Sequence, residues 1–123
     1  RSENIRVTLH SKEDIINLST ALSGSGPGFF YRILESFIIA GESSGLEKEI
    51  SRKLAIETFI GSAELLNSND SSPEELRVAV TSPGGTTEAG LNYLEEINID
   101  NIITQTISKA VQRGNELSDE SNK

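Results

Sequence analysis

Hydrophobic residues recur along most of the chain at spacings of three and four residues, which is the period of an amphipathic α-helix. Start and stop signals divide this pattern into helical segments. The predicted helices cover residues 12–22, 27–44, 47–67, 73–80, 86–96 and a last segment that ends near Leu117. The sequence therefore predicts an all-α fold.

Residues 5–9 follow a different pattern, in which Ile5, Val7 and Leu9 alternate with polar residues. Strict alternation is typical of a β-strand. A single strand has nothing to pair with in a helical chain. We therefore expect either the last strand of a sheet that this chain lacks or a strand that pairs with another copy.

The segment 27–44 is apolar around nearly its whole circumference, interrupted only by Arg32, Glu35 and Ser36. A helix of this kind must be covered on all sides. A chain of 123 residues builds a single modest core. The pattern therefore predicts a homodimer whose interface is centred on Phe30, Ile33, Leu34, Phe37 and Ile38.

Local signals mark several helix ends. Ser11 is expected to cap the first helix, and Ser72, followed by Pro73 and by a glutamate three residues on, predicts a capping box. Gly45 is expected just past the end of the helix at residues 27–44. Asp100 is the candidate cap of the last one.

Composition excludes several classes of function. Nineteen acidic against eleven basic residues give a net charge of -8, without any basic run, so nucleic acid and anionic membranes are not expected partners. The chain has no cysteine and one histidine, His10, and we expect no metal site. Its longest apolar runs are too short to span a bilayer or to form a secretory signal.

The strongest candidate for chemistry is the turn at residues 81–87, Thr-Ser-Pro-Gly-Gly-Thr-Thr. Two glycines leave backbone N–H groups unshielded, and the next helix directs the positive end of its dipole at them. Spacing alone favours a plain connector. The surrounding hydroxyls of Thr81, Ser82, Thr86 and Thr87 favour a pocket for a carboxylate or a phosphate. The other glycine-rich turn, residues 23–28, fits neither a phosphate loop nor a nucleophile elbow and is interpreted as a helix–helix turn.

Together the two turns resemble those of the pyrroline-5-carboxylate reductase family. Residues 20–27, Thr-Ala-Leu-Ser-Gly-Ser-Gly-Pro, stand at the family's separation from residues 81–87. Residues 40–41, 45–46, 61–63 and 113–117 also sit as in that family. The resemblance covers residues 5–117 and only the C-terminal, helical half of such an enzyme.

This resemblance implies an organisation for the whole protein. Residues 1–11 would be the last strand of a missing N-terminal Rossmann domain and its linker, 12–117 the helical dimerisation domain, and 118–123 a tail. The fold would be that of the C-terminal domain of 6-phosphogluconate dehydrogenase, in an interlocked homodimer, with five dimers often forming a ring. The missing domain would bind NADPH or NADH, and the cytoplasmic enzyme would reduce 1-pyrroline-5-carboxylate to L-proline, the last step of proline biosynthesis.

The resemblance also implies site residues. The substrate carboxylate would lie on the backbone amides of Gly85 and Thr86 and on the hydroxyl of Ser82. Thr87, the catalytic residue, would bind the ring nitrogen at the reduced C=N bond. The turn at Ser25 and Gly26 would border the cleft for nicotinamide and substrate, and the active site would span the dimer.

One departure from the family is large, because the chain lacks its glycine-rich nucleotide-binding sequence. Smaller ones are Gly28, where alanine is usual, and the two phenylalanines that follow it. The chain alone is therefore expected to be inactive. Two alternatives stay open: a standalone helical oligomerisation module without catalytic activity, and an unrelated helical domain that binds anions.

Overall fold

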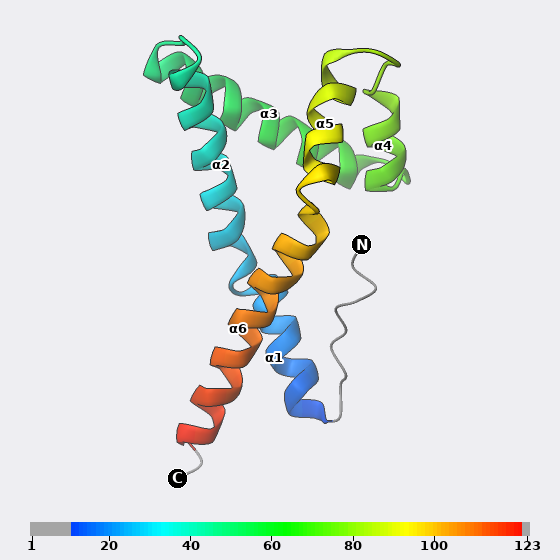
Figure 1. Cartoon of the computed structure of the whole chain (residues 1–123). Coiled ribbons are helices and arrows are strands. Elements are labelled where there is room, and N and C mark those ends of the chain that lie inside the picture. The colour runs from blue at the N-terminus through cyan, green and yellow to red at the C-terminus, as the bar shows by residue number, and fades with distance from the viewer. Residues whose placement is uncertain (1–10, 122–123) are drawn as a thin grey trace. The chain divides into compact units, whose positions relative to one another are not determined.

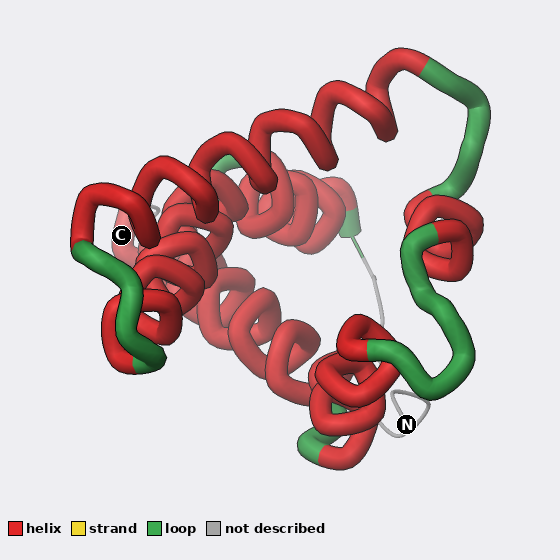
Figure 2. Tube along the Cα trace, turned by 90° about the horizontal axis from the view of Figure 1, so that it is seen from above, coloured by secondary structure: helices red, strands yellow, loops and turns green. Residues whose placement is uncertain are grey.

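The computed structural model describes residues 11–121, which form helices joined by short loops (Figure 1). The helices are α1 (Lys12–Ser23), α2 (Gly26–Ser43), α3 (Lys48–Ser68), α4 (Pro73–Ala79), α5 (Thr86–Glu96) and α6 (Ile99–Ser121). Figure 2 shows only helix and loop in this part of the chain. The predicted all-α class is confirmed, whereas the predicted strand at residues 5–9 lies outside the described residues.

Local side-chain chemistry fixes the helix ends as predicted. The hydroxyl of Ser11 accepts the Asp14 N–H at 3.2 Å, and Ser72 forms a reciprocal capping box with Glu75. Gly45 has a φ of +117°, a conformation that glycine adopts without a steric penalty. It follows α2 closely, which is the predicted role of this glycine.

The boundaries of α6 differ from the prediction. Asn98, and not Asp100, precedes the helix, and its side-chain oxygen accepts the Asn101 N–H at 3.2 Å. Asn98 has a φ of +55°, and asparagine tolerates this left-handed conformation better than most residues. At the other end α6 continues past Leu117 to Ser121, because the residues there contain neither glycine nor proline to stop it.

The described chain divides into two compact units. The first contains the residues up to Gly28 and those from Leu91 onward, so that α1 and α6 belong to it. These two helices pack together, and the side-chain amide of Asn17 donates to the side-chain oxygen of Asn115. A Cβ on Gly114 would lie 3.3 Å from the Asn17 side chain, so a glycine there lets the helices approach closely.

The second unit contains residues 29–90. Its helices α2 and α3 are joined by a tight loop, and the hydroxyl of Ser51 in α3 donates to the backbone oxygen of Ile38 in α2 at 2.7 Å. Ser51 is only 3% exposed. Its side chain fills the space in which a side chain at Gly41 would otherwise stand. The predicted extent of one helical domain, residues 12–117, stays a prediction.

Large hydrophobic side chains remain exposed in both units. Among the described residues Ala21 is the only hydrophobic one that is buried. In α2, by contrast, Phe30 is 56% and Phe37 is 62% exposed. A folded chain needs a buried apolar core to offset its loss of conformational entropy. The exposed apolar surface therefore indicates that these side chains need further apolar surface to cover them.

Candidate functional site

The turn between α4 and α5 has a conformation that its glycines determine. Gly84 has a φ of +74°, where a side chain would be strained. The N–H of Gly85 donates to the backbone oxygen of Ser82 at 3.0 Å and closes the turn. A Cβ on Gly85 would lie 3.1 Å from that same oxygen, so both positions favour glycine.

The N-terminus of α5 follows directly. Thr86 and Thr87 are its first two residues, and both are exposed. The first N–H groups of an α-helix have no acceptor within the helix, and they carry the positive end of its dipole. The backbone amides of Thr86 and Thr87 are therefore suited to bind an anion.

The four hydroxyls of the turn do not act alike. Thr81 donates its hydroxyl hydrogen to the backbone oxygen of Arg77 and so closes the end of α4. The sequence predicts that this hydroxyl faces a ligand, but its hydrogen is engaged within the chain. Ser82, Thr86 and Thr87 are exposed and keep their hydroxyls at the surface. The hydroxyl cluster is thus reduced to these three residues.

The amides of the two glycines are also engaged within the chain. Besides the bond from Gly85 to Ser82, the N–H of Gly84 donates to a carboxylate oxygen of Glu88 at 2.9 Å. A ligand carboxylate on the Gly85 amide would have to share that hydrogen with the Ser82 oxygen. The predicted role of Gly85 stays a prediction.

Glu88 is the residue of this turn that sequence reasoning missed. It stands three residues after Gly85, the residue that precedes α5, at the position from which a glutamate reaches back over a helix start. That spacing is the signal in the sequence that points to Glu88. The capping-box pattern requires serine or threonine before the helix, however, and this position is occupied by Gly85. Glu88 is half-buried.

The six predicted site residues fall into the two units. Ser82, Gly85, Thr86 and Thr87 come together in one turn of the second unit. Ser25 and Gly26 belong to the first unit, where the backbone oxygen of Ser25 accepts the Gly28 N–H at 3.0 Å and Gly26 is buried. Their predicted position beside the substrate cleft stays a prediction.

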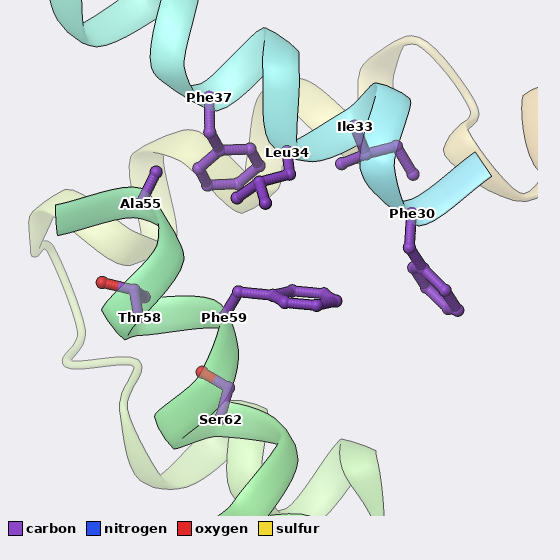
Figure 3. A pocket seen from close by; sticks show the side chains of 8 residues that line it. All are labelled: Phe30, Ile33, Leu34, Phe37, Ala55, Thr58, Phe59 and Ser62. Carbon is purple, nitrogen blue, oxygen red and sulfur yellow. The ribbon is translucent and has the colours of Figure 1, made fainter. Parts of the chain in front are cut away.

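A second feature of residues 29–90 is an apolar cavity of about 170 Å³ between α2 and α3. Figure 3 shows Leu34 and Phe37 directed from α2 toward α3, and Phe59 directed from α3 toward Phe30. The rings of Phe30 and Phe59 lie 6.2 Å apart, centre to centre. The other lining residues are Ile33, Ala55, Thr58 and Ser62. This lining suits apolar side chains better than a polar substrate.

The described residues also form neither a metal centre nor a membrane span. No group of three or more acidic, histidine or cysteine side chains gathers there in a way that could hold a metal ion. None of the described helices combines the length and the apolar character needed to cross a membrane.

Comparison with known proteins assigns the family. The profile described as "Pyrroline-5-carboxylate reductase dimerisation" matches residues 13–117. This match covers most of the chain, including both glycine-rich turns and the helices between them. The chain belongs to the pyrroline-5-carboxylate reductase dimerisation family.

Individual relatives agree with this assignment. Pyrroline-5-carboxylate reductase 1 of Bacillus spizizenii is 38% identical over 109 residues, which are 89% of this chain and 37% of that protein. A pyrroline-5-carboxylate reductase structure from Coxiella burnetii is similar with a TM-score of 0.82 and 40% identity, over 88% of this chain and 40% of that one. A Plasmodium falciparum pyrroline carboxylate reductase, solved with NADP bound, is similar with a TM-score of 0.79 and 32% identity, over 85% of this chain and 41% of that one. The chain thus spans about two fifths of the length of these relatives.

Proposed function

We propose that this chain is the C-terminal part of a cytoplasmic oxidoreductase that reduces 1-pyrroline-5-carboxylate to L-proline with NADPH or NADH. The observation that carries the proposal is the family match over residues 13–117, which includes the turn with its exposed Thr86 and Thr87. The relatives that share this region are named as pyrroline-5-carboxylate reductases. The turn has the chemistry that a small ring carboxylate requires.

The turn binds the carboxylate and orients the ring. The N–H of Thr86 and the hydroxyl of Ser82 donate to the carboxylate, with a share of the Gly85 N–H. Hydrogen bonds to an ionised group are shorter and stronger than neutral ones. The hydroxyl of Thr87, one residue further along α5, holds the ring nitrogen. Two points of attachment fix the C=N carbon in one orientation, and orientation supplies a large part of the rate in reactions of this kind.

The described residues of this chain do not form a binding site for the nicotinamide cofactor on their own. The described part has no strand followed by a glycine-rich helix start, which is the usual site for a dinucleotide pyrophosphate. The cofactor would therefore be held by a Rossmann domain that precedes this region, and when bound it would supply the hydride. Ser25 and Gly26 would border the shared cleft.

The second role of the chain is to form the dimer. The exposed side chains of α2 and the apolar cavity between α2 and α3 offer surface that a second copy would bury. An isologous interface suits this geometry, because the same helices are presented by both copies. We infer an interlocked homodimer, with five dimers in a ring for the whole enzyme and an active site that spans two chains.

The test is oxidation of NADPH or NADH in the presence of pyrroline-5-carboxylate. A protein of the relatives' length that ends in this chain should oxidise the cofactor at a rate that depends on the substrate. The chain of 123 residues should give none. If the longer protein is also inactive and the chain still dimerises, the standalone oligomerisation module is the better account.

A further inference from the structure

We propose that Glu88 is a positioning residue for the substrate turn. Its carboxylate holds the Gly84 N–H at 2.9 Å and thereby fixes the turn in the form that presents the amides of Thr86 and Thr87. The inference rests on the proposed function and adds to it a residue that does not touch the substrate.

The two glycines make such support necessary. Glycine loses more conformational freedom on ordering than any other residue, and Gly84 adopts a φ of +74° in a surface turn. The bond from Gly85 to Ser82 orders one side of the turn. Glu88 orders the other side from within α5, so the turn is tied to the helix whose first amides it presents.

The exposure of the glutamates on α5 agrees with this role. Glu88 is half-buried, whereas Glu95 and Glu96 on the same helix are exposed. Glu88 lies in the first turn of α5, where a negative side chain is favourable to the helix dipole. It therefore has both a hydrogen-bond partner and a favourable field, which hold it over the turn.

The negative charge of Glu88 weakens substrate binding, whereas its hydrogen bond supports it. The two effects can be separated by substitution. A carboxylate close to the site repels the carboxylate of the substrate. Glu88→Gln keeps an oxygen that accepts the Gly84 N–H and removes the charge. Glu88→Ala removes both. The two variants therefore distinguish positioning from repulsion.

The experiment measures steady-state kinetics of these variants in the longer protein that carries this chain. Glu88→Ala should raise the KM for pyrroline-5-carboxylate about tenfold, the effect of losing one hydrogen bond to a charged group. Its kcat should stay within about twofold, and its KM for the cofactor should not change. Glu88→Gln should restore the substrate KM to the wild-type value or below it. Glu95→Ala, which removes the same group from the other end of α5, should behave as wild type.

Amide hydrogen exchange of the chain itself, followed by NMR, supplies a readout apart from activity. The Gly84 amide should exchange faster in Glu88→Ala than in wild type and Glu88→Gln. An unchanged substrate KM in Glu88→Ala, or a KM that falls in both variants, would overturn the positioning role. So would an unchanged Gly84 exchange rate. Loss of turnover in the wild-type protein would instead remove the proposed function, and the role of Glu88 in substrate binding with it.

Discussion

Ser51 occupies the space beside Gly41, and the two residues join α2 to α3. A Cβ built on Gly41 would lie 3.0 Å from the Ser51 Cβ and closer still to its hydroxyl oxygen. That hydroxyl is held in place by its bond to the backbone oxygen of Ile38. The absence of a side chain at position 41 and the buried serine at position 51 therefore depend on each other.

Gly41→Ala should destabilise the fold. The new methyl group would displace the Ser51 hydroxyl and leave it and the Ile38 oxygen without their bond, at a cost of about 1–3 kcal/mol. The measurement is the free energy of unfolding in denaturant. Gly61→Ala is the matched control, because nothing lies within 4 Å of a Cβ there. It should stabilise α3 by about 1 kcal/mol through helix propensity, and equal effects of the two variants would contradict this packing.

Leu34→Asp should abolish the dimer. Leu34 lines the apolar cavity between α2 and α3. Burial of an uncompensated neutral polar group costs about 2–7 kcal/mol, and burial of an unpaired carboxylate costs more. Sedimentation equilibrium should show monomer, or the protein should be insoluble. Ser36→Asp places the same group on the polar side of α2, where Arg32 lies within hydrogen-bonding distance of Ser36. This variant should remain a dimer, and a soluble folded dimer of Leu34→Asp would refute the interface.

Thr87→Ala should lower kcat in the longer protein, on the order of 100-fold, because the hydroxyl that holds the ring nitrogen is lost. Thr87→Ser keeps the hydroxyl and should recover most of the rate. Thr106→Ala removes a threonine hydroxyl from α6, where it donates to the backbone oxygen of Ile102. That control should keep wild-type kinetics. Unchanged kinetics in Thr87→Ala would exclude Thr87 from the site.

The capping box of α4 should make stability depend on pH in the acid range. Glu75 accepts the Ser72 N–H at 2.8 Å, and this bond and that to the Ser72 hydroxyl lower the pKa of Glu75 below its usual 4.5. A folded-state pKa below the unfolded one adds stability that is fully present above the unfolded pKa. The contribution is lost as pH falls through the folded pKa. The difference in free energy of unfolding between wild type and Glu75→Gln should therefore shrink below pH 4.5, and a constant difference from pH 7 to 3 would contradict it.

The parts of the structure that sequence could predict are those governed by neighbouring residues. The caps at Ser11 and Ser72 and the reversal at Gly45 depend on side chains within a few positions, so their patterns were sufficient. The cap at Asn98 was missed because only two residues separate α5 from α6, and aspartate and asparagine compete for that role. The reason for glycine at position 41 could not be predicted, since it depends on Ser51 across the helix pair.

The candidate site, too, has features that the sequence could predict and features that it could not. The glycine-rich turn and the threonines of α5 were visible as a motif, and their meaning came from resemblance to a family. Three donors of the turn are engaged in hydrogen bonds to Arg77, Ser82 and Glu88. The residue types of the turn alone do not specify these bonds. The sequence therefore predicted the turn but not which of its donors stay available.

The most direct test of the substrate turn is a crystal structure of the longer protein with bound L-proline. The carboxylate of proline should lie within hydrogen-bonding distance of the Thr86 N–H and the Ser82 hydroxyl, and the ring nitrogen within that distance of the Thr87 hydroxyl. Proline bound elsewhere, with this turn empty, would contradict the account.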